Sequence, residues 1–270
     1  MAAMFCWADA WLFSRQPDWN GLRVTFGFGL SAFERIPRIS SDAINQGYTV
    51  SKRCSNANGF MLGTRYWKNN DTAAMPMYDR NGYIIGIQSA VSVTKAKERG
   101  YPSPSISKWF HKEGDLYTIT MYFVDPATLR CDSGRTARDF KNDGTGTGLW
   151  LQMDKKQALH MPMLQTEVQQ LAPWVEGKCF WWMGKHYWHN LSEDMRCNDF
   201  TPIFLMYNRG KLNAFGFAFN VDLSSPRFEH PAPFTLLNFL PFVPKCFSKE
   251  KGRISTMHVY LTDSPRLNFC

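Results

Sequence analysis

The segment Tyr117-Thr-Ile-Thr-Met-Tyr-Phe-Val124 decides the fold class, because polar and apolar side chains alternate along it. A period of two is the side-chain period of a β-strand with one face toward a core. Similar runs, rich in aromatic or β-branched residues and bounded by turn formers, recur at 22–28, 83–91, 148–153, 202–207, 212–219 and 254–261. The sequence therefore predicts a mainly β protein.

Two turn signals indicate that neighbouring strands run antiparallel. Asn81-Gly82 and Asn208-Arg-Gly210 each separate two strand-like runs, and both favour hairpins because Asn and Gly tolerate positive φ. Helical signals are confined to residues 40–46 and 164–171, which end before a glycine and a proline respectively. We expect a β-sandwich or a β-rich α+β fold, with antiparallel sheets and one or two short helices.

Length and composition describe a chain that can bury a large core. Of 270 residues, 44% are hydrophobic and 15% aromatic, which excludes a disordered protein. Nineteen Gly and fifteen Pro without a fixed period exclude a collagen-like chain. We predict one large β-rich domain over 1–270, with a sub-division near 94–108, where a Gly- and Pro-containing connection would form the boundary.

The charge is basic but dispersed. Thirty-one Lys and Arg against 23 Asp and Glu give a net charge of +8 and a pI of about 9.1. Neither of the denser basic stretches, 94–99 and 245–253, interleaves basic with aromatic residues as single-strand-binding surfaces do. We therefore expect solvated loop charge and no nucleic-acid partner.

The cysteines point to an oxidising compartment. No apolar run approaches the ~20 residues of a spanning helix, and the N-terminal residues do not resemble a signal peptide. Seven cysteines are spread along the chain, and Cys54, Cys131 and Cys197 sit in polar, turn-like settings that suit disulfides better than buried thiols. Cys179 and Cys197 are the first pair expected to bond. Because seven is odd, at least one thiol is free or pairs between chains.

Two N-glycosylation sequons agree with secretion. Asn70-Asp-Thr72 and Asn190-Leu-Ser192 both match the acceptor pattern, which also occurs by chance. We predict a secreted, extracellular glycoprotein, and a cytosolic location is the alternative.

Histidine and methionine gather in the C-terminal half. His186, His230 and His258 are candidate metal ligands, with Met183 and Met257 as auxiliary donors. Imidazole with thioether suits copper, because the soft sulfur stabilises Cu(I). The spacing matches no established metal motif, and the donors would have to converge from separate strands. The alternative is that these are ordinary core or surface residues. Glu229, beside His230, is a further acid–base or ligand-orienting candidate.

Paired aromatics form the second candidate site. Trp181-Trp182 and Tyr187-Trp188 are adjacent pairs, and neighbours on a strand point to opposite faces. One ring of each pair must therefore meet solvent, a ligand or a second layer. Such rings line pockets for small molecules and stack on sugars. The alternative is that both faces of the sheet are covered.

Signatures of nucleophilic catalysis are absent from the sequence: it has no G-x-S-x-G elbow and no thiol-protease context around a cysteine. We therefore predict a secreted, disulfide-bonded β protein that binds copper or a small ligand in an aromatic-lined pocket, with metal-dependent redox chemistry if it is an enzyme. The alternative is a non-catalytic extracellular glycan- or matrix-binding protein.

Overall fold

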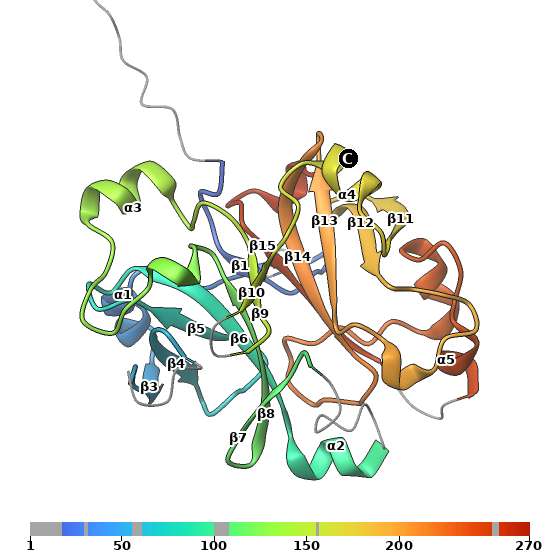
Figure 1. Ribbon diagram of the computed structural model, residues 1–270, viewed down its shortest axis with the longest axis horizontal. Coiled ribbons are helices and arrows are strands. Elements are labelled where there is room, and N and C mark those ends of the chain that lie inside the picture. The colour runs from blue at the N-terminus through green and yellow to red at the C-terminus, as the bar shows by residue number, and fades with distance from the viewer. Residues whose placement is uncertain (1–17, 30–31, 56–60, 100–107, 155–156, 250–253) are drawn as a thin grey trace, which may run out of the picture.

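The 117–124 run forms a central strand of one of two antiparallel sheets in the computed structural model, which describes residues 18–29, 32–55, 61–99, 108–154, 157–249 and 254–270. The first sheet runs in the order β10 (Ala158–His160), β9 (Trp150–Gln152), β8 (Leu116–Tyr122), β6 (Ile84–Ser92), β5 (Met75–Tyr78), β4 (Thr64–Lys68) and β3 (Tyr48–Lys52). β7 (His111–Glu113) pairs with β8 beside this path. Figure 1 shows this sheet on the left, in blue to green.

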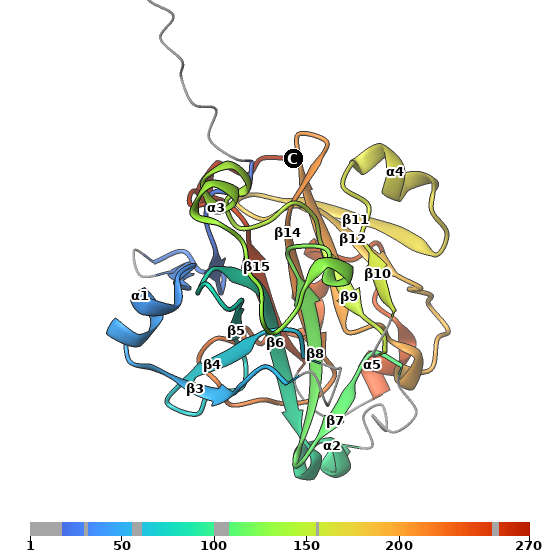
Figure 2. The same ribbon diagram turned by 60° about the vertical axis from the view of Figure 1, so that its left-hand side comes forward.

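The second sheet runs in the order β11 (Trp174–Phe180), β12 (Gly184–His189), β13 (Ile203–Asn208), β14 (Lys211–Phe219), β15 (Ser255–Tyr260), β1 (Arg23–Val24) and β2 (Glu34–Arg35). The chain starts in this second sheet with β1 and β2, passes through the first sheet from β3 to β10, and returns to the second sheet from β11 to β15. Within each sheet, strands consecutive in sequence are neighbours, except that β6 pairs with β8, and β15 pairs with β1. Figure 2 shows the two layers from a second direction.

Three apolar clusters follow from the alternation of the strands. Leu205 and Phe215 point between the sheets into the largest cluster, whereas Phe204 and Met206 point outward from the second sheet. The outer cluster is covered by the segment 233–249, which holds the 3-10 helix η3 (Pro233–Asn238) and α5 (Lys245–Lys249). A smaller third cluster lies around Tyr122. Both faces of the second sheet are thus covered.

The predicted fold class is confirmed, with local differences. Both predicted hairpins form, with Gly82 and Gly210 at positive φ. The predicted strand at 22–28 is reduced to β1, because Thr25 takes a φ of 68° and leaves the extended conformation. The two predicted helices form as α1 (Ser40–Asn45) and α4 (Gln165–Gln170).

The described residues hold three more α-helices than the two that the pattern predicts. α2 (Val93–Arg99) begins the 94–108 connection. α3 (Ala137–Asp143) lies within the polar stretch 131–147, where no helix is predicted. Thr136 and Asp139 cap α3 reciprocally, a T-x-x-D signal readable in the sequence. β6 and β8 flank the 94–108 connection and are hydrogen-bonded neighbours in one sheet. The sub-division there stays a prediction.

The described residues form three disulfides, and the expected Cys179–Cys197 pairing is wrong. Cys179 bonds Cys270, Cys197 bonds Cys246, and Cys54 bonds Cys131, with Cα–Cα separations of 6.1, 5.5 and 5.5 Å. The reason is geometric. Cys179 lies near the β11–β12 turn, opposite Lys185. Between this turn and Cys197 the chain runs along the whole of β12, about 20 Å at ~3.4 Å per residue, so Cys197 lies too far from Cys179 to bond it. The disulfides agree with an oxidising compartment. No described helix is long and apolar enough to cross a bilayer.

Candidate functional site

The structure brings together two of the predicted metal donors, His186 and His258. Their ring centroids lie 6.1 Å apart in the outer cluster of the second sheet. The Nδ1 atom of His186 is 3.0 Å from the carbonyl oxygen of Lys178, whereas its Nε2 is buried without a partner. Burial, together with the charge of His258, lowers the pKa of His186 to about 3. His186 is therefore neutral at physiological pH.

Of the other three predicted donors, Met183 shares the outer cluster with His186 and His258, whereas Met257 and His230 do not join them. Met257 points between the sheets, because neighbours on β15 face opposite sides. Met183 is buried in the outer cluster. His230 Nδ1 lies 3.2 Å from the carbonyl oxygen of Ile254 and 3.8 Å from Asp222. Within the described ranges, no group of three His, Cys, Asp or Glu side chains could hold a metal ion.

Glu229 serves His258 rather than its neighbour His230. Its Oε2 is 3.2 Å from His258 Nδ1 and accepts a hydrogen bond from Thr256 Oγ1, while its Oε1 accepts from the backbone N–H of Phe26 at 2.6 Å. Glu229 pairs with Thr256 in an isolated β-bridge, so the backbone there is extended. Adjacent side chains on extended backbone point in opposite directions, and Glu229 and His230 therefore face opposite sides. The carboxylate orients the His258 ring and ties the residues after β1 to β15.

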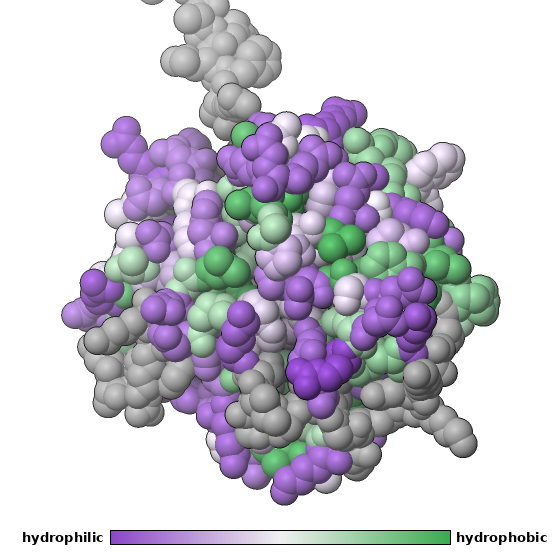
Figure 3. Space-filling view, turned by 45° about the vertical axis from the view of Figure 1, so that its right-hand side comes forward, coloured by the Kyte–Doolittle hydropathy of each residue, from purple (hydrophilic) through white to green (hydrophobic). Residues whose placement is uncertain are grey.

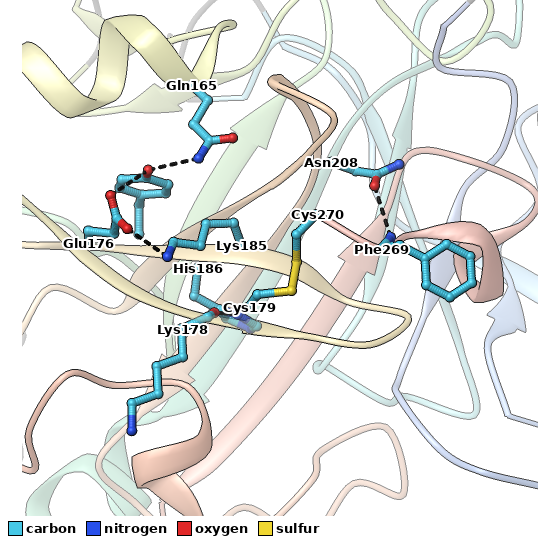
Figure 4. Close-up of a disulfide and its surroundings, with 10 residues drawn as sticks. Gln165, Glu176, Lys178, Cys179, Lys185, His186, Asn208, Phe269 and Cys270 are labelled. Atoms are coloured by element: carbon cyan, nitrogen blue, oxygen red, sulfur yellow. Dashed lines mark hydrogen bonds and ion pairs between the residues drawn. A yellow bond between two sulfur atoms is a disulfide. The ribbon is translucent and has the colours of Figure 1, made fainter.

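Two of the four predicted ligand-binding aromatics are core residues. Tyr187 faces the space between the sheets and Trp188 faces the outer cluster, and both are buried. The Tyr187 hydroxyl donates to Glu176 and accepts from Gln165. Figure 4 shows Glu176 and Gln165 on one side of the Cys179–Cys270 disulfide. Both faces of β12 are covered at the Tyr187-Trp188 pair, so this pair belongs to the core and neither of its rings lines an open pocket.

The remaining two aromatics are at the β11–β12 turn. Trp181 is 73% exposed, whereas Trp182 is partly covered by the Arg266 guanidinium, 5.2 Å from its ring centroid. Phe28 approaches the Trp182 ring at 5.7 Å. Ligand binding by these two rings stays a prediction.

Both sequon asparagines are exposed at turns. Asn70 and Asn190 have φ values of 57° and 54°, and their side chains are accessible for modification. Glycosylation of either residue stays a prediction.

Sequence reasoning missed a cleft of about 700 Å³ at one end of the sandwich, which we name the Arg227 cleft. It lies where the β4–β5 turn of the first sheet meets the segment before β15. It is lined by residues 68–72, by Ala90, Ser92 and Lys95, by Glu34 of β2, and by residues 223–228. The volume is in the range of small-molecule sites.

Arg227 is the buried centre of the cleft wall. Its Nε and Nη2 donate to the two oxygens of Glu34 at 2.8 and 2.7 Å, and its Nη1 donates to Asp71 at 3.0 Å. Nη2 also donates to the Tyr48 hydroxyl at 3.3 Å. Asp71 accepts a further hydrogen bond from Ser225 Oγ. The network joins β2 of the second sheet to the β4–β5 turn of the first.

Charges in the network compensate one another. Burial alone lowers the pKa of Arg227, but the hydrogen bonds and charge of Glu34, with the charge of Asp71, outweigh burial and raise it above its ordinary value. Burial raises the pKa of Tyr48 to about 12, so its hydroxyl stays protonated. Four of the five guanidinium N–H groups are engaged within the protein. Arg227 therefore organises the wall and is not a free anion receptor.

The lining has a polar rim and an apolar floor. Ser92, Ser224 and Ser225 bring hydroxyls to the rim, and Leu223 and Phe228 provide apolar surface that is mostly buried. Three basic and two acidic residues line the cleft, so its formal charge is only +1. No sequence motif marks this site, because Glu34 and Arg227 are separated by 193 positions.

The described residues form an antiparallel β-sandwich with three disulfides and a polar cleft. The chain matches no protein-family model, no curated protein and no solved structure.

Proposed function

We propose that the protein is a secreted, non-catalytic binding protein that holds a neutral glycan segment in the Arg227 cleft. The single observation that carries the proposal is the cleft itself, about 700 Å³ in volume and lined by hydroxyl, amide, ammonium and carboxylate groups over a small apolar floor. Sugars present many hydroxyls and a few C–H faces, and this lining offers partners for both.

Electrostatics favour a neutral ligand over an anionic one. The guanidinium is already neutralised by Glu34 and Asp71, and a phosphate or carboxylate would have to displace one of them. Glu34 keeps a 39% exposed side chain, which can accept hydrogen bonds from the hydroxyls of a ligand. A neutral polyol makes hydrogen bonds to the rim without disturbing the buried ion pairs.

The test is binding of neutral oligosaccharides to the full-length protein, measured by glycan array and calorimetry. Ser224→Trp should abolish binding, because Ser224 is exposed at the rim and a Trp there fills the cleft without removing a network residue. Ser133→Trp, an equally exposed position outside the cleft, should bind as the wild type does. Equal binding by both variants, or binding of acidic glycans only, would refute the proposal.

A native glycan on Asn70 would stand at the rim and change access to the cleft. The binding assay is therefore done on protein from a secretory host and on the Asn70→Gln variant. Mass spectrometry of the peptides that contain Asn70 and Asn190 tests the predicted modifications and secretion together.

We propose copper binding at His186 and His258 as a second candidate. The buried, unpartnered Nε2 of His186 and the neighbouring His258 ring support it. Met206 stands opposite His186 in the β12–β13 register and offers a thioether on the same face. Elemental analysis after incubation with copper should give one equivalent per chain, and His186→Gln should lose it. Substoichiometric copper in folded protein would refute this candidate.

A further inference from the structure

A second surface of the protein, separate from the Arg227 cleft, exposes large apolar side chains. Trp181 and Phe28 are 73% and 72% exposed, and Leu267 and Phe269 are 63% and 52% exposed. We name these four residues the apolar tip. Exposed Trp, Phe and Leu side chains gathered at one place mark an interaction surface.

The apolar tip is assembled from three chain segments that contact one another. The backbone N–H of Trp182 donates to the carbonyl oxygen of Asn268 at 2.8 Å, which joins the β11–β12 turn to the C-terminal segment. Arg266 Nη2 donates to the carbonyl oxygen of Gly29 at 2.7 Å, next to Phe28. Figure 4 shows the Cys179–Cys270 disulfide that fastens the C-terminal segment to β11.

The base of the tip is rigid. Arg266 lies over the rings of Phe33 and Trp182, at 5.8 and 5.2 Å from their centroids. The backbone N–H of Phe269 donates to Asn208 Oδ1 at 2.9 Å. The backbone that carries the apolar side chains is therefore held by a disulfide, hydrogen bonds and the Arg266 guanidinium over two rings, and little order has to be gained on binding.

Charge around the tip is mostly basic. The segments that build and flank it, 26–29, 177–185, 208–210 and 264–270, contain Lys178, Lys185, Arg209 and Arg266. The adjoining acidic residues are Glu176 and Asp263, and Asp263 is paired with Arg23 and Arg35. Lys185 is paired with Glu176 of β11, and Lys178 and Arg209 are exposed. Figure 3 shows hydrophilic and hydrophobic residues intermixed over one face of the molecule.

We propose that the apolar tip docks the protein on an anionic lipid surface. Trp and Phe insert at the depth of the headgroups, where an amphipathic ring is favourable, and Arg209 and Arg266 lie against the lipid phosphates. Phe28, Leu267 and Phe269 offer no hydrogen bonds to a sugar, so lipid fits this surface better than a glycan. The charge complementarity selects anionic over zwitterionic membranes.

The experiment is flotation of the full-length protein with phosphatidylcholine vesicles, with and without phosphatidylserine, together with Trp fluorescence. The wild type should float only with the anionic vesicles and show a blue shift, and salt should weaken its binding. Trp181→Ser should weaken the partition by about tenfold or more, because an inserted Trp is lost. Arg209→Glu should weaken it with the apolar residues intact.

Two controls separate the tip from other effects. Ile44→Ser removes an exposed apolar side chain on α1 and should leave flotation unchanged, as should the cleft variant Ser224→Trp. The proposal fails if the wild type does not float or if Trp181→Ser floats as well as Ile44→Ser. It also fails if the protein binds sulfated glycan but no vesicles. It fails as well if the wild type is a dimer and Trp181→Ser converts it to a monomer, because the tip would then be a dimer interface.

Discussion

Replacing Arg227 with Met should lower the free energy of unfolding by about 3 kcal/mol, because the buried network would lose its only cation. Arg227 has a 7% exposed side chain and donates four hydrogen bonds, which link β2 to the β4–β5 turn. Removing it leaves two carboxylates without a counterion.

The magnitude follows from the exposure of the two carboxylates. Breaking a buried ion pair on one side destabilises by ~3–5 kcal/mol. Asp71 is only 18% exposed and carries most of that penalty, whereas Glu34 is 39% exposed and regains water. We therefore expect a value at the lower end of the range. Asp71→Asn added to Arg227→Met should recover part of the loss, because no buried charge is then left unpaired.

The assay is urea unfolding followed by Trp fluorescence, with the disulfides intact. Arg196→Met is the matched control, because Arg196 also holds two hydrogen bonds to one carboxylate, that of Asp199, but its side chain is 82% exposed. It should leave the urea midpoint unchanged. If Arg227→Met shifts the midpoint no more than Arg196→Met does, the network does not fasten the two sheets and the reasoning is wrong.

Three further predictions concern the disulfides, the buried histidine and the second sheet. Non-reducing peptide mapping should recover Cys179 linked to Cys270, and the Cys179→Ser/Cys270→Ser variant should lose about 4 to 5 kcal/mol, the chain-entropy value for a separation of 91 residues; a Cys179–Cys197 peptide would contradict the structure. Because the folded pKa of His186 is about 3 against ~6.5 unfolded, the unfolded state takes up the proton first, so stability falls as pH decreases from about 6.5 toward 3. His186→Gln should reduce the loss of unfolding free energy between pH ~7 and ~4.5 by about 2.5 kcal/mol, and an unchanged loss would refute a buried neutral imidazole. Gly216→Ala should destabilise by about 1 to 3 kcal/mol, because the added Cβ collides with the Phe204 ring, whereas Gly29→Ala, with open space around it, should have little effect on the thermal midpoint.

Much of the fold could be predicted because its signals are local. The alternation in 117–124 and 212–219 depends on which face of one strand is buried, and the Asn81-Gly82 turn is set within five residues, by the positive φ of Gly82 and the hydrogen bonds that the Asp79 carboxylate accepts from Asn81 and Tyr83. Prediction failed where contacts with residues distant in sequence determine the backbone conformation. Thr25 leaves the extended conformation and donates to the carbonyl oxygen of Arg227, 202 positions away.

The candidate sites were predicted less well than the fold. His186 and His258 do meet, because β12 and β15 present them on the same outer face of the second sheet. Met257 does not join them, because it is adjacent to His258 on a β-strand and its side chain therefore points to the opposite face, between the sheets. Tyr187 and Trp188 are buried on opposite faces, because a second layer covers each face.

The sequence by itself determined the β class, the hairpins, two short helices and the presence of disulfides, because periodicity, turn chemistry and cysteine context act over a few residues. Only the tertiary structure decided which cysteines pair, which aromatic rings remain exposed and where a cleft opens. Glu34, Asp71 and Arg227 belong to different elements and become partners only when the two sheets close on each other. Such proximity depends on strand order and register, and strand order and register are set by the packing of the whole chain rather than by any one segment.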